Sequence, residues 1–234
     1  MKSLFKALNI LEYVILQNGA NVTPSQAAEA LGVNLVTCTR IMQAWTERGY
    51  LVNVSRKSGY VPGPMITSVG MHENGYQKLA AAAAGPVAEL AQRLNRKVNL
   101  AVMHRGRRVM LNWKIVNSTE RSWPELFFSR HWRSATGRLL LAFLPPAEAR
   151  EILRKESVTP FPAKELAVLR KTGIVCFAES EALNIVGSVL RIPGYPIAAL
   201  GFGAAPERTE EALKATRQTI EKIRNVLTAV EADY

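Results

Sequence analysis

The sequence predicts an α+β fold in two domains, on the basis of two observations. The first seventy residues hold three amphipathic helix patterns followed by a basic hairpin pattern. Beyond residue 95, short apolar runs are separated by turns that contain Gly or Pro, and helix patterns lie between them, which is typical of antiparallel strands in a mixed domain. We therefore expect an N-terminal domain over 1–70, a linker helix over 71–95 and a C-terminal domain over 96–234.

Two helix patterns open the N-terminal domain. The apolar residues that recur at helical spacing in the first, and that we expect to be buried, are Leu4, Leu8, Leu11 and Ile15. The second helix begins at Thr23-Pro24-Ser25-Gln26. This is a capping box, in which a threonine N-cap and a glutamine three residues later satisfy free backbone amides, and proline suits the first helical position. Gly32 ends this short helix.

The third helix pattern carries a candidate reading face. We expect it to begin after the N-cap Asn34 and to end near Arg48, before Gly49. Its expected core contacts are Val33, Ile41 and Trp45, and its expected exposed side holds Leu35, Val36, Thr37, Thr39 and Arg40. Two helices joined by a tight turn with Gly, the second with short polar side chains and an arginine outside, form a helix-turn-helix. Such a helix fits the major groove, where arginine can pair with guanine.

A basic hairpin follows this helix. Residues 50–54 alternate as a strand, residues 55–59 form a turn, and a return strand ends at Pro62. Such a wing would place Arg56 and Lys57 beside the phosphate backbone or in a minor groove. Each piece alone is common, but the ordered set indicates a winged helix-turn-helix that binds DNA. The candidate DNA-binding residues are Ser25, Asn34, Thr37, Thr39, Arg40, Arg56 and Lys57.

The C-terminal part has the pattern of a GAF-like domain. A helix over 74–95 contains Pro86, as a kink or a new first turn. Apolar runs at 98–103 and 109–111 flank a basic turn, and further strands are expected at 173–177, 187–192 and 196–202. A long final helix over 206–230 has an apolar face formed by Leu213, Ile220, Ile223 and Val226. Mixed helices and antiparallel strands of this kind suit an α+β sensor fold.

Short motifs follow one another in a characteristic order along nearly the whole chain. They are Lys6 to Leu11, Leu31-Gly32-Val33, Thr37 with Arg40, Gly49-Tyr50, Gly85-Pro86-Val87, Ser134 to Ala142, Leu169 to Gly173 and Ile197 to Leu200. In this order the sequence resembles the IclR family of bacterial transcriptional regulators. The resemblance implies an operator-binding winged helix, a GAF-like effector-binding domain, and assembly as a homodimer or a dimer of dimers.

The chain departs from the family pattern in both domains. Leu35-Val36 stands where the family usually has Lys-Ser at the start of the recognition helix. Gly201 and Gly203 replace serines that are common in the late strand of the family's pocket, and the region from Glu181 to Gly187 is poorly kept. These differences favour a diverged effector pocket.

The resemblance places Ser134-Ala135-Thr136-Gly137 at the mouth of the effector pocket. Arg130, Arg133 and Arg138 bracket this segment. Backbone amides and arginine side chains together suit a carboxylate, so one interpretation is a small organic acid as effector. The other is that these arginines pair with glutamates of a neighbouring subunit or meet solvent. The candidate effector-binding residues are Arg130, Arg133, Ser134, Ala135, Thr136, Arg138, Gly201 and Gly203.

Charge and composition set limits on the function. The net charge is +11, and its excess lies mainly between residues 71 and 140, so it is weak evidence for DNA binding by the first domain. The sequence has no nucleophile elbow, phosphate loop or metal-ligand spacing, no acidic partner for His131 can be named, and Cys176 lies in an apolar strand and is expected in the core. We expect no catalysis, no cofactor and no metal.

The expected function is that of a sequence-specific, cytoplasmic transcriptional regulator whose binding to double-stranded operator DNA is modulated by a small organic acid. No apolar run is long enough to cross a membrane, and no signal peptide is expected. The alternative is a winged-helix DNA-binding protein whose C-terminal domain is a ligand-free dimerisation or protein-interaction module. The sequence leaves open the operator, the effector, activation or repression, and dimer or tetramer.

Overall fold

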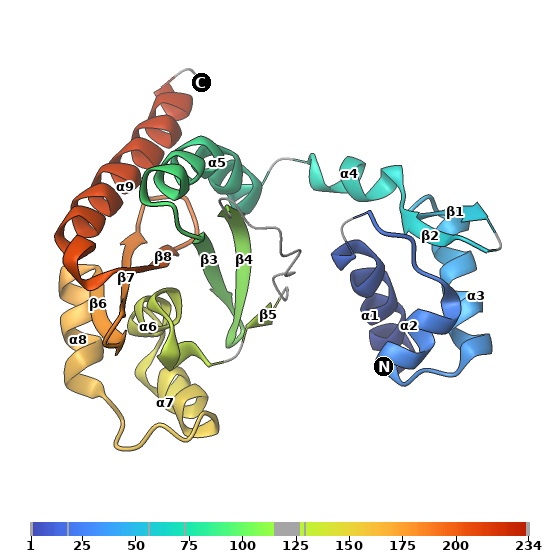
Figure 1. Cartoon of the computed structure of the whole chain (residues 1–234), viewed down its shortest axis with the longest axis horizontal. Helices are drawn as coiled ribbons and strands as arrows, with labels where there is room; N and C mark the ends of the chain where they lie inside the picture. The colour runs from blue at the N-terminus through green and yellow to red at the C-terminus, as the bar shows by residue number, and fades with distance from the viewer. Residues whose placement is uncertain are drawn as a thin grey trace. The chain divides into compact units, whose positions relative to one another are not determined.

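The computed structural model describes residues 2–232 except 18, 56, 73, 115–126 and 129. The chain forms two compact units, and the boundary along the chain lies between Glu73 and Asn74. Each unit has its own hydrophobic core, so each is described separately. Together they form the α+β fold that the sequence predicts (Figure 1).

The first unit is a small helical domain with a two-stranded sheet. Its elements are α1 (Lys2–Leu16), α2 (Pro24–Leu31), α3 (Leu35–Glu47), β1 (Leu51–Ser55), β2 (Gly59–Pro62) and α4 (Pro64–Gly70). The capping box at the start of α2 is present, and Gly32 ends α2 in the left-handed conformation. β1 and β2 pair as an antiparallel hairpin. The winged helix-turn-helix arrangement is therefore confirmed, with the short helix α4 as an addition that the sequence did not indicate.

The buried face of α1 differs from the expected one. Ile10 and Val14 are fully buried with Leu11, whereas Leu4 is 61% exposed and Leu8 is also exposed. The apolar residues of α1 form two overlapping stripes, and packing against α2 and α3 selects the C-terminal one. In α3, the fully buried residues are likewise not the expected ones, because Cys38 and Met42 fill the centre while the expected contacts pack around them.

The second unit is a six-stranded antiparallel sheet covered on both faces. In spatial order its strands are β5 (Phe127–Phe128), β4 (Arg107–Lys114), β3 (Val98–His104), β8 (Ala198–Ala204), β7 (Leu183–Leu190) and β6 (Ile174–Ser180). One face is covered by α5 (Gly75–Leu94) and α9 (Thr209–Ala232). The other face is covered by α6 (Ala135–Ala142), α7 (Pro146–Lys155) and α8 (Ala163–Thr172). Two 3₁₀ turns, η1 (His131–Arg133) and η2 (Pro206–Arg208), precede α6 and α9.

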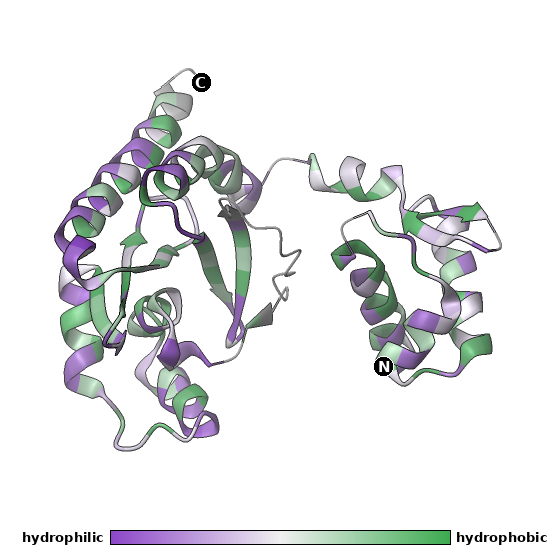
Figure 2. Ribbon diagram, viewed as in Figure 1, coloured by the Kyte–Doolittle hydropathy of each residue, from purple (hydrophilic) through white to green (hydrophobic). Residues whose placement is uncertain are grey.

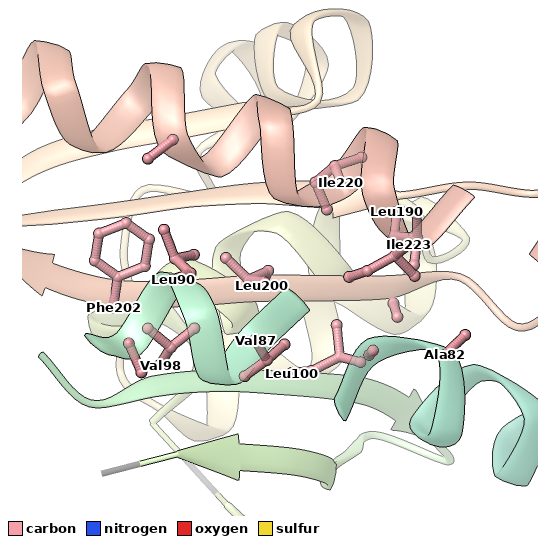
Figure 3. Packing of buried hydrophobic residues seen from close by; sticks show 14 of the residues in the cluster. Ala82, Val87, Leu90, Val98, Leu100, Leu190, Leu200, Phe202, Ile220 and Ile223 are labelled. Carbon is pink, nitrogen blue, oxygen red and sulfur yellow. The ribbon is translucent and has the colours of Figure 1, made fainter. Parts of the chain in front are cut away.

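The helix that we expected as a linker is part of the core of the second unit. α5 runs continuously through Pro86, and Val87 and Leu90 point toward Leu200 of the sheet (Figure 3). In Figure 2 the central strand β3 is largely apolar along its length, whereas β4 begins with hydrophilic residues. The two apolar faces of the sheet explain why β3 and β8 are rich in buried residues rather than strictly alternating.

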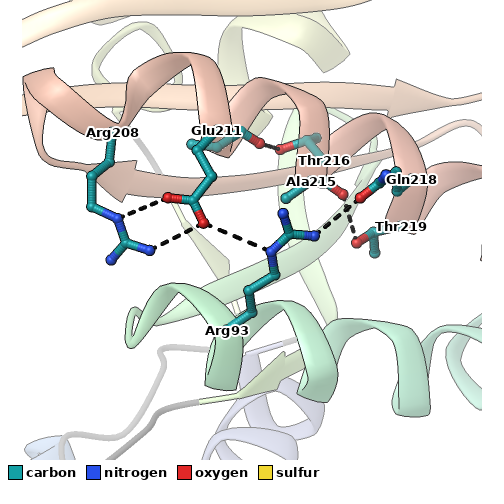
Figure 4. Close-up of polar contacts among 8 residues, drawn as sticks. Arg93, Arg208, Glu211, Ala215, Thr216, Gln218 and Thr219 are labelled. Carbon is teal, nitrogen blue, oxygen red and sulfur yellow. Dashed lines mark hydrogen bonds and ion pairs between the residues drawn. The ribbon is translucent and has the colours of Figure 1, made fainter.

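Polar contacts tie α5 to α9 at the edge of this core (Figure 4). Arg93 donates to Gln218 at 3.0 Å and lies 3.7 Å from the carboxylate of Glu211, which also accepts from Arg208. α9 buries threonines within its apolar face, because the Thr216 hydroxyl donates to the backbone carbonyl one turn earlier and is thereby satisfied.

Two expectations about burial in this unit are wrong. Val226 is 44% exposed, and Leu227 takes the core position instead. Cys176 is exposed rather than buried, because β6 is the last strand of the sheet and its outer positions lack a covering neighbour.

Candidate functional site

The candidate DNA-reading face is the exposed side of α3. Its first turn is fixed by Asn34, whose side-chain oxygen accepts from the amides of Val36 at 3.0 Å and Thr37 at 3.3 Å. The Thr39 hydroxyl donates to the carbonyl of Leu35 at 2.9 Å. Two of the predicted contact residues thus have local hydrogen bonds that shape the helix.

The remaining side chains on this face are a mixture of apolar and polar groups. Leu35 is 47% exposed and Val36 is 66% exposed, so two adjacent large apolar side chains lie on the outer surface of the helix. Thr37 and Arg40 are exposed beside them, and Ser25 is exposed on the first turn of α2. The face therefore offers one guanidinium, hydroxyls and an apolar patch.

The wing is held in place by the segment between α1 and α2. Val22 and Tyr60 exchange two backbone hydrogen bonds, at 2.9 and 2.8 Å. Gly59, with φ of +89°, makes this approach possible, since a Cβ there would lie 2.4 Å from the carbonyl oxygen of Val22. Lys57 is exposed at the tip of the wing, and Arg56 lies outside the described residues.

The candidate effector pocket lies at the first turn of α6. It is a cavity of about 230 Å³. Six of the eight predicted effector residues line it, namely Arg133, Ser134, Ala135, Thr136, Gly201 and Gly203. Lys97, Asn99, Ile185 and Phe202 complete the lining and were missed in the sequence. Lys97 directly precedes β3, and the other three lie on strands whose inward positions only the pairing of β3, β8 and β7 defines.

The pocket offers groups suited to an anion and one free acceptor. The first amides of a helix have no partner within the helix and carry partial positive charge. The N-cap of α6 is Ser134, whose hydroxyl accepts from the amide of Gly137 at 3.1 Å. Lys97 and Arg133 are exposed cations in the lining. The side-chain oxygen of Asn99 is buried and has no hydrogen-bond partner among the described residues, so it can accept from a ligand donor.

Gly201 permits the close approach of α6 to the sheet. A Cβ at this position would lie 2.8 Å from the Cβ of Ala135 and 3.1 Å from Cγ2 of Thr136. A serine, as is common in the resembled family, would therefore require α6 to shift.

The other two predicted effector residues lie outside this cavity. Arg138 is stacked between the rings of Trp132 and Phe177, with its guanidinium carbon 4.5 and 3.6 Å from their centroids. It also pairs with Glu165 of the same chain at 2.7 Å. Arg130 lines a separate hollow of about 640 Å³ with Lys155 and Glu156.

A polar network around η1 lies next to the N-terminal end of α6. The carboxylate of Glu156 accepts from the backbone amides of His131 at 2.7 Å and Trp132 at 3.1 Å, and it contacts Nδ1 of His131. Burial opposes ionisation, but these donors together lower the pKa of Glu156. The structure thus supplies the acidic partner of His131 that could not be named from the sequence. His131 is itself buried, and Glu156 lies 25 positions later in the chain, so no local pattern links them.

Arg108 is the second unexpected member of this network. It is 6% exposed, it contacts the Ser134 hydroxyl, and it lies 5.4 Å from the ring of Phe128. Burial lowers its pKa to about 10, against a smaller effect of Glu156, so it stays cationic at neutral pH. It links β4 to the N-cap of α6.

The described residues also bear on two other types of site. Within that part of the chain, no group of three or more His, Cys, Asp or Glu side chains is arranged to hold a metal ion. None of its helices combines the length and the apolar character that crossing a membrane requires.

No protein-family model matches the chain, and no curated protein matches it by sequence. Solved structures do match. An IclR homolog from Microbacterium hydrocarbonoxydans, complexed with 4-hydroxybenzoate, is 20% identical with a TM-score of 0.75, over 97% of this chain and 99% of that one. The IclR protein of Thermotoga maritima is 22% identical with a TM-score of 0.61, over 96% and 98%. An IclR transcriptional regulator from Alicyclobacillus acidocaldarius is 18% identical with a TM-score of 0.71, over 97% and 98%. Over nearly its full length, the chain has the fold of the IclR transcriptional regulators.

Proposed function

We propose that this protein is a transcriptional regulator of the IclR type that binds operator DNA in sequence-specific fashion and responds to a small organic acid. The observation that carries the proposal is the outer face of α3. It combines Arg40 and Thr37 with two apolar side chains that no described residue covers, on a fold that solved transcriptional regulators share. The protein acts in the cytoplasm, where its operator is.

The DNA contacts follow from the chemistry of this face. Arg40 donates to a guanine in the major groove, and Thr37 reaches a phosphate or a base edge. Leu35 and Val36, which are not hydrogen-bonding groups, pack against thymine methyl groups. Lys57, with Arg56, contacts the phosphate backbone and supplies affinity without sequence preference. Asn34 and Thr39 act mainly by shaping the first turn of the helix, since their side chains already have backbone partners.

The effector is a small carboxylate that also carries a hydroxyl group. Its carboxylate lies at the first amides of α6, with Arg133 and Lys97 adding positive charge. Its hydroxyl donates to the free oxygen of Asn99. One relative by structure is complexed with 4-hydroxybenzoate, a molecule that carries both groups, which supports this class of ligand.

The regulator works as a homodimer or a dimer of dimers. A two-fold protein matches a pseudo-palindromic operator. Leu4 and Phe5, which are 61% and 59% exposed on α1, provide an apolar surface that a second copy of the chain would cover. Effector binding then changes the spacing or orientation of the two reading helices.

The test is selection of bound sequences from a pool of random double-stranded DNA by the purified full chain. We expect enrichment of an inverted repeat, and loss of that enrichment in Arg40→Ala with retained folding. Arg48→Ala, at the far end of the same helix, is the matched control. Failure of the parent protein to enrich any sequence would contradict the proposal.

A second candidate is a DNA-binding protein whose second unit is a ligand-free association module. The small cavity and the glycine at position 201 favour it. A thermal-shift screen of small carboxylates, with and without a hydroxyl, separates the two. Stabilisation by a hydroxy acid that is lost in Asn99→Ala and Arg133→Ala, but kept in the control Arg154→Ala, supports the effector. No stabilisation by any acid, with an intact dimer, supports the second candidate.

A further inference from the structure

The second unit contains a strongly basic groove in addition to the candidate effector pocket. It is a cavity of about 370 Å³ between the end of α8, the end of β7 and the middle of α9. The cations in its lining are Arg170, Lys171, Arg191, Arg217 and Arg224. The only carboxylate in the lining is that of Glu221, so four positive charges are in excess.

These cations converge from three separate parts of the chain. Arg170 and Lys171 lie in the last turn of α8, where basic residues favourably meet the helix dipole. That explanation does not apply to Arg191, which follows β7, or to Arg217, which lies inside α9. The charge of the groove is therefore a product of the fold rather than of one helix pattern.

Several of the guanidinium groups are already oriented. Arg170 donates to the carbonyls of Ala142 and Leu144, and Arg191 lies 5.2 Å from the ring of Phe143. Arg224 contacts Glu221. By contrast, no ion pair joins Lys171 or Arg217 to an acidic side chain of the described residues. The groove thus has fixed cations at its sides and two cations left for a ligand.

We propose that this groove binds a small molecule that carries a phosphate or diphosphate group. Like charges held close together repel, and a multiply charged anion would remove that repulsion. Arginine forks match phosphate oxygens, and one phosphate group concentrates nearly two negative charges in a small volume. The volume of the groove falls within the lower range of small-molecule sites. The proposal is independent of the effector pocket, with which the groove shares no lining residue.

The experiment is calorimetric titration of the full chain with pyrophosphate, at an ionic strength held constant with potassium chloride. We expect saturable binding that is about tenfold weaker in Arg217→Ala. Glu221→Gln removes the only competing carboxylate and leaves Arg224 free, so we expect it to bind pyrophosphate more tightly than the parent. The matched controls are Arg154→Ala on α7 and Glu181→Gln on the β6–β7 turn, which change charge by the same amount outside the groove.

Three outcomes of the titrations with pyrophosphate would overturn the proposal. They are the absence of saturable binding by the folded parent, equal binding by parent and Arg217→Ala, and a loss in Arg154→Ala as large as that in Arg217→Ala. Binding of a glutamate-rich peptide without binding of pyrophosphate would also reject a small phosphate ligand, in favour of an acidic protein segment. Melting curves of each variant show that it is folded before its affinity is compared.

Discussion

The two units differ in how many cationic side chains they carry and in how many of these are left free to meet a ligand. On α3 of the first unit, the amide of Asn34 and the hydroxyl of Thr39 bond to the backbone, and the groups left facing outward include a single guanidinium, that of Arg40. In the second unit arginines are abundant, but Arg108 and Arg138 are held against the fold by partners that are distant in the sequence. Net charge therefore does not locate the surface that meets DNA, because burial and pairing decide which charges are available.

The largest effect that we expect is on the internal network of the second unit. Glu156→Ala leaves the partly buried amides of His131 and Trp132 and the buried ring of His131 without their acceptor, and the loss should be about 3 kcal/mol of unfolding free energy. Urea denaturation measures it. Glu151→Ala is the control, because its partners Arg154 and Lys155 lie at the surface and such pairs contribute under about 1 kcal/mol. Equal losses in the two variants would mean that the network is not buried in solution.

The same carboxylate makes stability depend on pH in a defined direction. The pKa of Glu156 is below its ordinary value of 4.5 in the folded chain. The contribution of this carboxylate to the free energy of unfolding is therefore complete above pH 4.5, and it is lost as the pH falls through the lower pKa that Glu156 has in the folded chain. The difference in unfolding free energy between the parent and Glu156→Gln should shrink as the pH falls from 4.5 toward 3. A difference that grows over this interval would contradict the assigned role.

The local structure of the first unit could be predicted because its signals are local. The capping box at Thr23, the N-cap Asn34 and the stop at Gly49 each act within a few residues, and the structure has all three. The buried face of α1 could not be predicted, since its apolar residues fit two faces equally well. Only contact with α2 and α3 selects between Leu8 and Val14.

The lining residues of the candidate effector pocket could be predicted where they belong to one sequence motif. Ser134 to Thr136 adjoin in sequence and line the same cavity, and Gly201 joins them through strand pairing. Arg138 belongs to the same motif, yet it points to Glu165, 27 positions away. The pairing of His131 with Glu156 is equally remote. Side chains with several possible partners are placed by the tertiary fold, which spacing along the chain does not encode.

On the reading face, Arg40→Ala should have the next largest effect. A bidentate contact with guanine is worth about 1 to 3 kcal/mol of discrimination, so affinity for the selected operator should fall by that amount while affinity for random DNA stays nearly the same. Fluorescence anisotropy with both DNAs at one salt concentration measures the two affinities. If Arg48→Ala weakens operator binding as much, the contact surface lies elsewhere on α3.

The wing should show a different signature from the helix. Lys57→Ala should weaken binding to operator and random DNA alike, and the slope of log affinity against log salt should become smaller by about 0.9. Titrations at four or more salt concentrations give the slope. An unchanged slope with lower operator affinity would place Lys57 at a base edge instead of a phosphate.

The smallest expected effect concerns the exposed apolar side chains of Leu35 and Val36, which distinguish this face of α3 from a purely basic DNA-binding surface. Replacing thymine by deoxyuracil in the operator removes only the 5-methyl group. Where that methyl group packs against Val36 or Leu35, its removal should weaken the free energy of binding by about 0.8 kcal/mol. The loss should occur at particular thymines, and it should vanish in Val36→Ala or Leu35→Ala because the partner is already absent. A uniform or undetectable loss at every thymine would mean that these exposed side chains do not read DNA. Sequence-specific binding through Arg40 could still hold in that case, so the apolar contact stands or falls separately from the regulator itself.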